Sequence, residues 1–221
     1  MSRVRPLAGG GRAVEVAPRR LHGWFERFAE QHGGAADTEV GADRVRVRAV
    51  DGALAVVDVP FEPLPQPSGR RSGLAVSELV DHVGRSRRIG LVLVRLGAHS
   101  VGACVDGKVV TSSTDRHLVH GRNKAGGWSQ QRFARRREEQ SRKALESAAD
   151  AVARVLLPER LDGLVLGGDR QALDTLGRDR RLAALLATAE PRVLDVAEPR
   201  RAVLDEAAAR AVAVEVRVHD P

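Results

Sequence analysis

The sequence contains no tyrosine and few aromatic residues of any kind, since Phe, Trp and Tyr together make up 3% of its 221 residues. Its hydrophobic share of 43% is still that of a globular protein. Val, Leu and Ala must therefore fill the core. At this length the chain has room for one good-sized domain or two small ones.

Cysteine occurs only once, as Cys104, so an intrachain disulfide is excluded and a reducing compartment is favoured. The residues around Cys104 alternate like a strand, which favours a buried, inert thiol over a nucleophile. Long hydrophobic runs are also missing. The first residues have no apolar segment typical of a signal peptide, and no stretch reaches membrane-spanning length. We expect a soluble, cytoplasmic protein without a membrane partner.

Acidic residues are outnumbered, with 29 Asp and Glu against 36 Lys and Arg, for a net charge of +7. This excess favours a polyanionic partner, with nucleic acid ahead of an anionic membrane. An arginine-rich composition alone would spread the charge evenly. Residues 116–143 instead hold nine basic and two acidic residues, a local excess as large as that of the whole chain. The clustering favours a specific basic surface.

The hydrophobic pattern divides the chain into three parts. Residues 1–11 are basic and glycine-rich and are expected to form a flexible tail. Residues 12–85 show the pattern β-α-β-β-α, including a hairpin with an Asp51-Gly52 turn. In residues 86–219 three strands come first, and helices and strands alternate afterwards. This order predicts an α/β (α+β) fold, a mixed sheet with flanking helices.

The stretch "HGRNKAGGWSQQRFARRREEQ", residues 120–140, is poorly suited to a core. Gly126 and Gly127 allow the backbone to approach another surface closely. A glutamine amide donates and accepts hydrogen bonds but cannot act as a base. On the helix expected next, arginines cover most of the circumference, and Phe133 is the only strong apolar residue. We predict a mobile loop over residues 121–129 that enters another molecule's site while arginines hold nucleic-acid backbone.

The stretch "HLVHGRNKAGGWSQQRFARRREEQ", followed by "LDGLVLGGD", resembles the catalytic domain of eukaryotic and archaeal peptide-chain release factors. In that family a Gly-Gly-Gln loop precedes an Arg-Phe-Ala-Arg helix and a "GLVLAG"-like strand, matched here by residues 132–135 and 163–168. The tip differs, because Trp128 and Ser129 stand before Gln130. This Gly-x-x-Gln spacing is similar to the Vms-like release factor (VLRF) family, in its bacterial, actinobacterial-type branch.

The resemblance spans about residues 88–212 and implies an RNase H-like core and codon-independent hydrolysis of peptidyl-tRNA on stalled ribosomes. The implied partners are the large ribosomal subunit, ribosomal RNA and peptidyl-tRNA, and no metal or organic cofactor is implied. The tip would orient a water molecule or the tRNA 3′ ribose without proton transfer. The implied site comprises Gln130, Gly126 and Gly127 as catalytic residues, Trp128, Ser129 and Gln131 as support for the tip, and Arg122, Lys124, Arg132, Arg135, Arg136 and Arg137 as RNA contacts.

Several alternatives stay open at this point. The resemblance also implies a second activity, because some VLRF members act as nucleases on the tRNA 3′ CCA end. A non-catalytic protein that binds RNA or the ribosome would carry a similar basic loop. Gln131 could replace Gln130, and neither the stalled complex, the role of residues 12–85 nor the oligomeric state is indicated. His117 and His120 lack nearby metal-ligand types, which disfavours a metal site. In "VLGGD" we expect a tight strand-to-helix turn with Asp169 as the N-cap.

Overall fold

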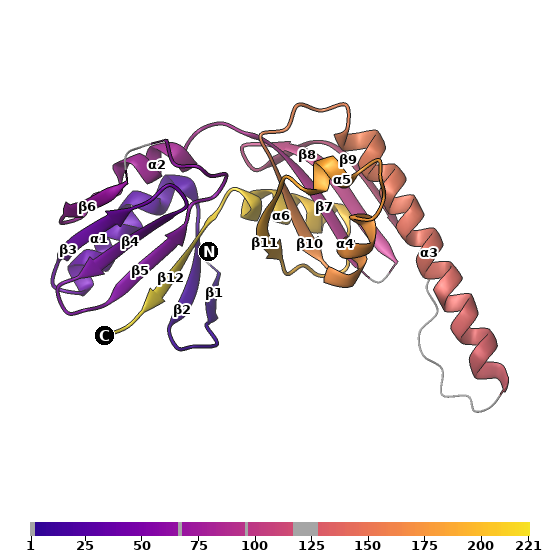
Figure 1. Ribbon diagram of the computed structural model, residues 1–221, viewed down its shortest axis with the longest axis horizontal. Helices are drawn as coiled ribbons and strands as arrows, with labels where there is room; N and C mark the ends of the chain where they lie inside the picture. The colour runs from indigo at the N-terminus through magenta and orange to yellow at the C-terminus, as the bar shows by residue number, and fades with distance from the viewer. Residues whose placement is uncertain (1–2, 66–67, 96, 117–127) are drawn as a thin grey trace. The chain divides into compact units, whose positions relative to one another are not determined.

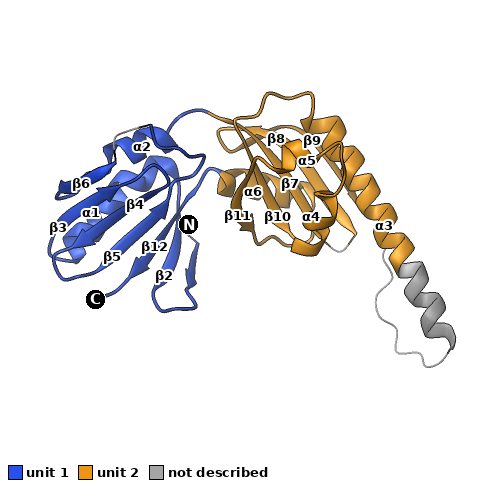
Figure 2. Cartoon of the chain, viewed as in Figure 1, with its two compact units in different colours: residues 1–86, 212–221 blue, residues 87–211 orange. Residues whose placement is uncertain are grey.

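The computed structural model describes residues 3–65, 68–95, 97–116 and 128–221, with the backbone alone for residues 128–137. The chain forms two compact units (Figure 2). The first consists of Met1–Ser86 together with Val212–Pro221, and the second of Arg87–Ala211. The chain therefore leaves the first unit at Ser86, builds the second, and returns to complete the first.

The first unit contains one antiparallel sheet and two helices that cover one of its faces (Figure 1). Its helices are the 3-10 helix η1 (Pro18–Arg20), α1 (Leu21–Gln31) and α2 (Ser77–Val83). Its strands are β1 (Val4–Pro6), β2 (Arg12–Val16), β3 (Ala35–Val40), β4 (Arg44–Ala49), β5 (Leu54–Asp58), β6 (Gly69–Ser72) and β12 (Val214–His219). The strand order is β1-β2-β12-β5-β4-β3-β6.

Helix α1 forms where the apolar residues recur at helical spacing. Leu21, Phe25 and Phe28 lie on one side of the helix and are buried against the sheet. Trp24 stacks on Phe28 with ring centroids 5.7 Å apart and an interplanar angle of 6°. These contacts fix the helix on the sheet.

The opposite face of this sheet carries charged side chains. In β4, Val45 and Val47 are buried, whereas the intervening arginines lie on the other face, as the hairpin pattern predicts. Arg44 Nε lies 2.8 Å from Asp58 Oδ1, and Arg217 Nη1 lies 2.6 Å from Asp58 Oδ2. Arginines and carboxylates of adjacent strands thus neutralise one another.

The expectation of a flexible tail over residues 1–11 is corrected by β1. Val4 pairs with Val14 and Pro6 with Arg12 in an antiparallel ladder along the edge of β2. Arg5 Nη2 also lies 2.9 Å from Glu215 Oε1. The open edge of β2 supplies hydrogen-bond partners that composition does not reveal.

Two further strands, β3 and β6, correct the expected β-α-β-β-α pattern. β3 has a weak apolar alternation, because one of its two buried positions is Thr38 and only Val40 is a buried hydrophobic residue. The Thr38 hydroxyl donates to the Gly73 carbonyl at 2.7 Å and accepts the Ala75 N–H at 3.0 Å. Because a threonine with both hydrogen bonds satisfied can occupy this buried position, the sequence of β3 does not show the regular apolar alternation that identifies a strand.

The closing strand β12 belongs to the first unit, although residues 86–219 were expected to form one domain. It pairs with β2 on one side and β5 on the other, and Val214, Val216 and Val218 are buried in the first core. Its alternating sequence predicts a strand but does not identify its partners.

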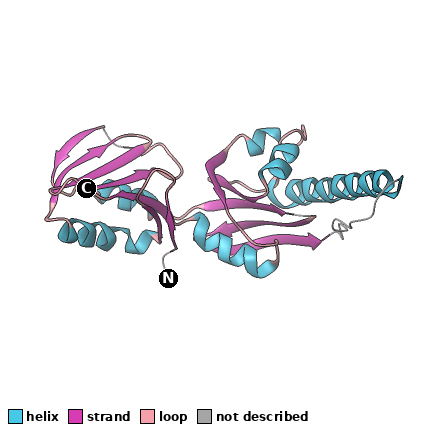
Figure 3. Cartoon of the chain, turned by 90° about the horizontal axis from the view of Figure 1, so that it is seen from below, coloured by secondary structure: helices cyan, strands magenta, loops and turns pink. Residues whose placement is uncertain are grey.

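The second unit is an α/β unit with a mixed sheet (Figure 3). Its elements are β7 (Arg88–Arg95), β8 (Ala98–Val105), β9 (Lys108–Arg116), α3 (Trp128–Leu156), β10 (Gly163–Gly168), α4 (Arg170–Leu176), α5 (Ala183–Leu186), β11 (Ala189–Leu194) and α6 (Arg201–Ala211). The order is β11-β10-β7-β8-β9, with β7, β10 and β11 parallel and β7, β8 and β9 antiparallel. Helices α3, α4 and α5 cover one face and α6 covers the other. This confirms the predicted α/β class and mixed sheet with flanking helices.

Strand β10 is central, between β7 and β11, and leads directly into α4. Gly168 has φ +102°, and a Cβ at this position would lie 2.1 Å from the Val94 carbonyl oxygen. Asp169 Oδ1 accepts the N–H of Gln171 at 2.9 Å, which confirms the predicted N-cap. The glycine and the cap together fix the turn at the carboxyl end of the strand.

Candidate functional site

Helix α3 carries the predicted tip. Its range begins at Trp128, so Gln130 and Gln131 fall within it, and the expected loop over residues 121–129 overlaps the helix by two residues. Gln, Arg and Ala in this stretch are good helix formers, which accounts for the earlier start. The predicted residues Arg122, Lys124, Gly126 and Gly127 lie outside the described residues, as do His117, His120 and the side chains of Trp128, Ser129, Gln130, Gln131, Arg132, Phe133, Arg135, Arg136 and Arg137.

The C-terminal part of α3 anchors the helix to the sheet. Its first buried side chain within the described stretch is that of Ala144, and Leu156 is the last. Residues 138–143 are exposed apart from the half-buried Gln140. Leu145, next to Ala144, is only half buried and packs against the same core. The buried residues of α3 are Ala144, Ala148, Ala149, Ala151, Val152, Val155 and Leu156.

Ion pairs along the helix stabilise its exposed turns. Lys143 Nζ lies 3.0 Å from Glu139 Oε1, and Arg142 Nη1 lies 2.7 Å from Glu146 Oε1. Each pair of this spacing contributes about 0.2–0.5 kcal/mol to a helix. They also neutralise two of the basic residues in the cluster. Residues 117–137 contain six Lys and Arg and no acidic residue, so the excess positive charge is concentrated there.

The segment before α3 starts from a well-fixed strand. β9 pairs with β8 up to Arg116, whose Nε lies 3.0 Å from Glu198 Oε1. A hydrogen bond from Arg200, together with the charge of Arg116, holds the pKa of Glu198 below its usual range. Arg154 of α3 donates to the Ser113 hydroxyl at 2.9 Å and ties the helix to the strand.

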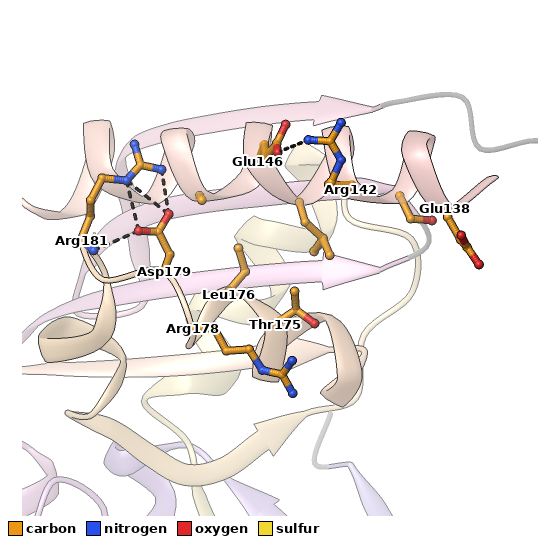
Figure 4. A pocket seen from close by; sticks show the side chains of 11 residues that line it. Glu138, Arg142, Glu146, Thr175, Leu176, Arg178, Asp179 and Arg181 are labelled. Atoms are coloured by element: carbon orange, nitrogen blue, oxygen red, sulfur yellow. Dashed lines mark hydrogen bonds and ion pairs between the residues drawn. The ribbon is translucent and has the colours of Figure 1, made fainter. Parts of the chain in front are cut away.

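A second clamp holds α3 against the loop after α4. Arg181 donates to Asp179 Oδ2 at 2.7 Å (Figure 4). It also donates to Asp150 Oδ1 at 2.9 Å. The hydrogen bond from Arg181 is the main reason that the pKa of Asp179 lies below its usual value. The sequence pattern did not identify this clamp, because Asp150 and Arg181 are 31 positions apart.

A groove of about 720 Å³ runs between α3 and this loop (Figure 4). Its floor is apolar and includes Leu145, Ala149 and Leu176. A smaller hollow of about 280 Å³ adjoins it at the carboxyl ends of β7 and β10, where Val94 and Asp169 line it. The carboxylates of Glu146 and Asp179 on the rim of the groove are paired with arginines.

The described residues include no reactive thiol and no cluster of metal ligands. Cys104 is buried, and burial raises the pKa of its thiol to about 11, which confirms the expected inert cysteine. No group of three or more His, Cys, Asp or Glu in the described part of the chain is placed to hold a metal ion. No helix of that part is long and apolar enough to cross a membrane. The arrangement is a firm support for a basic helix.

The solved structures that match the chain include two archaeal proteins. The chain is 14% identical to an archaeal translation termination factor, aRF1, with 89% of this chain and 73% of that chain covered and a TM-score of 0.37. A second structure, described as an archaeal protein, is 17% identical, with coverage of 73% and 48% and a TM-score of 0.35. No curated protein matches the chain.

A family model provides the decisive comparison. The model described as Actinobacteria/chloroflexi VLRF1 release factor matches residues 87–217, which is more than half of the chain. The match covers the second unit and most of β12, and it includes the glycines, Gln130 and α3. It confirms the resemblance seen in the sequence. The chain belongs to the Actinobacteria/chloroflexi VLRF1 release factor family.

Proposed function

We propose that this protein is a codon-independent release factor that hydrolyses peptidyl-tRNA on stalled ribosomes or large subunits in the cytoplasm. The observation that carries the proposal is the position of the Gly-Gly-Trp-Ser-Gln sequence. The glycines come directly before α3 in the chain, and Trp128, Ser129 and Gln130 are its first three residues. The described side chains of this helix are buried only from Ala144 onward. Family membership supports the same interpretation.

The charge distribution supports binding to RNA through the start of α3. The six basic residues of residues 117–137 have no acidic residue among them. Such a stretch displaces counterions from RNA phosphates, and the affinity then depends steeply on salt. Phosphate contacts of this kind position a protein without reading sequence, which suits a factor that recognises no codon. In the proposal Arg122, Lys124, Arg132, Arg135, Arg136 and Arg137 make these contacts.

The chemistry proposed for the tip is positioning. Ester hydrolysis needs a water molecule aligned with the carbonyl and donors for the developing oxyanion. Gln130 orients the water or the 3′ ribose through its amide, and Gly126 and Gly127 let the backbone approach the tRNA end closely. Trp128, Ser129 and Gln131 support the tip. Positioning contributes up to about 7–11 kcal/mol in the best intramolecular cases. The ribosome supplies the surrounding RNA, and the proposal involves no cofactor.

The proposal is tested by peptide release from purified large subunits that carry peptidyl-tRNA. We expect release by the unchanged protein, and a loss of about 10- to 1000-fold in Gln130→Ala, the usual cost of one positioning donor. Binding of Gln130→Ala to the subunits should survive, because the arginines hold the complex. Gln131→Ala is the matched control and should be mild, because its side chain points about 100° away on a helix.

Three outcomes would contradict parts of the proposal. Full peptide release by Gln130→Ala, together with loss of release in Gln131→Ala, would show that Gln131 is the catalytic glutamine. Full activity in both single variants and in the double variant would remove the catalytic role of the tip. A tRNA product that has lost its CCA end, identified by mapping the 3′ terminus, would identify a nuclease in place of an esterase.

A further inference from the structure

Eight of the arginines of the first unit are paired with carboxylates. The unit contains 13 arginines, no lysine and 13 acidic residues, so its formal charge is zero. Most of the arginines lie within 4 Å of a carboxylate, on the open face of the sheet or at its edges. The paired residues are Arg5, Arg12, Arg44, Arg46, Arg48, Arg70, Arg71 and Arg217.

Three arginines, two just before α1 and one within it, differ from this group. Arg19, Arg20 and Arg27 are exposed, and none of them has a carboxylate partner among the residues that the structure describes. Arg20 and Arg27 are seven positions apart, which places them two turns apart on the same side of the helix. α1 has no acidic residue in its first turn, so the positive end of the helix dipole adds to these charges.

Gly23 lies between Arg20 and Arg27, about one turn from each. Gly23 is the third residue of α1, and glycine is among the poorest helix formers. Nothing in the described structure requires it, because a Cβ there would meet only Arg27 Nη1 at 3.4 Å and Glu26 Oε2 at 3.7 Å, both at the ends of flexible side chains. Its effect is instead on the outer surface, where the half-buried backbone is flanked only by the flexible ends of Arg27 and Glu26, which can move aside for a ligand.

We propose that Arg19, Arg20, Gly23 and Arg27, the α1 stripe, form a second RNA-binding surface that takes the phosphate backbone of an RNA duplex. The inference rests on the proposed function, because the ribosome supplies such duplexes. Unpaired guanidinium groups bind phosphate oxygens with two parallel hydrogen bonds. The missing side chain at Gly23 lets the backbone of the RNA pass between them. Burial of Leu21, Phe25 and Phe28 holds the stripe in place.

The carboxylates of α1 do not cancel the stripe. Glu26 is the carboxylate nearest to Gly23, since its Oε2 lies 3.7 Å from the position of a Cβ there, but its single negative charge leaves the three arginines with a net positive charge. Its Oε1 lies 3.4 Å from His22 Nδ1, one turn earlier. Glu30 lies nearly one turn beyond Arg27, toward the C-terminal end of the helix. RNA also fits better than an anionic membrane, because the large hydrophobic side chains exposed in the described residues, Val4, Val50, Val110 and Leu157, are not on α1.

The test measures binding of the full chain to a short RNA duplex over a range of potassium chloride concentrations. The first variant replaces Arg19, Arg20 and Arg27 with Gln. We expect the slope of log affinity against log salt to fall by about two to three units, at roughly 0.9 for each phosphate that is no longer neutralised. The control replaces Arg160, Arg170 and Arg180 with Gln, which are exposed and also lack a partner among the described residues.

Gly23→Ala provides the sharper variant. Alanine is the better helix former, and its Cβ fits without a clash, so we expect the melting temperature of the first unit to rise by several degrees. Affinity for the duplex should nevertheless fall severalfold, because a methyl group now separates the two backbones. A purely structural role for Gly23 predicts the first effect without the second.

Two results would overturn the proposal. One is an equal decrease of the salt slope in the α1 triple variant and in the control triple variant. The net charge of the protein, and not the position of these arginines, would then determine the binding. The other is unchanged duplex affinity in both Gly23→Ala and the α1 triple variant. Binding to phosphatidylserine vesicles is measured alongside, and a loss of vesicle binding alone in the triple variant would likewise overturn the proposal. These readouts do not use peptide release, so a failure of the hydrolase proposal leaves this test intact.

Discussion

Nη1 of Arg181 lies 2.9 Å from Oδ1 of Asp150, and the same guanidinium binds Asp179 two positions before it in the chain. The contact joins the middle of α3 to the loop that follows α4. Both carboxylates accept from one rigid, planar group, so the loop and the helix are held at a fixed spacing. The buried part of α3 is thus also held by an ion pair, on the side of the helix that lines the groove.

Asp150→Asn should loosen this tie without changing the core. We expect faster amide hydrogen exchange in the turns of α3 around position 150 and in the loop around position 180, because local opening becomes easier. Asp174→Asn is the matched control, an exposed carboxylate on α4 with no partner among the described residues. Equal exchange in the two variants would show that the clamp contributes nothing to the order of α3.

Leu156→Ala should destabilise the second unit by about 2–5 kcal/mol, because Leu156 is 1% exposed and its removal leaves a cavity under the end of α3. The neighbouring Leu157 is 48% exposed. Leu157→Ala should therefore change the stability by no more than about 0.5 kcal/mol. Urea unfolding followed by circular dichroism measures both. A similar decrease in the two variants would contradict the inward face assigned to α3.

Gly168→Ala should destabilise the second unit severely. The backbone conformation alone costs a residue with a Cβ about 1–3 kcal/mol. The steric conflict with the Val94 carbonyl, at 2.1 Å, adds to that cost. Gly177→Ala is the control, since a Cβ there meets the Asp174 carbonyl oxygen at an ordinary 3.4 Å. Thermal unfolding decides the outcome, and a wild-type melting temperature in Gly168→Ala would show that the turn can be rebuilt.

Acid should weaken the first unit through Asp58. Partial burial favours its neutral form, but hydrogen bonds from Arg217 and Arg44 outweigh this effect and hold the pKa of Asp58 below its ordinary value of 3.8. A lowered pKa in the folded state means stability that is present above pH 3.8 and is lost as the pH falls below it. In Asp58→Asn the fall in melting temperature between about pH 5 and pH 3 should be smaller. An identical fall would place the acid sensitivity elsewhere.

Gln130→Glu should not restore peptide release. If Gln130 positions a water molecule or a hydroxyl group, a carboxylate loses the amide donor and brings negative charge close to RNA. If the residue at this position accepts a proton, glutamate should be at least as active as glutamine. Release from large subunits over a range of pH distinguishes the two cases, because a working carboxylate would add an acid limb to the profile.

Local sequence signals predicted the parts of the fold that depend on neighbours in the chain. The Asp106-Gly107 turn of the β8–β9 hairpin has φ values of 50° and 76°, as an Asp-Gly pair in a tight hairpin requires. The apolar run in β10 and the cap at Asp169 follow from equally local patterns. The candidate tip was found in the same way, from a short motif in the sequence.

Features that depend on distant partners were not predicted. β1 is ordered because β2 offers an open edge, and β3 conceals its inward face behind Thr38. The bridge from Arg181 to Asp150 and the α1 stripe require knowledge of which charges are already paired in three dimensions. An exposed arginine and a neutralised one look the same in a sequence. Pairing therefore had to be read from the fold.

The place of β12 between β2 and β5 sets an order for folding during synthesis. The second unit has all of its described strands and helices once residue 211 is made. The first unit is begun earlier, yet β2 and β5 lack the strand that joins them until residues 214–219 are made. The unit that is translated first is thus closed last, and until then the facing edges of β2 and β5 are open to pairing with other chains.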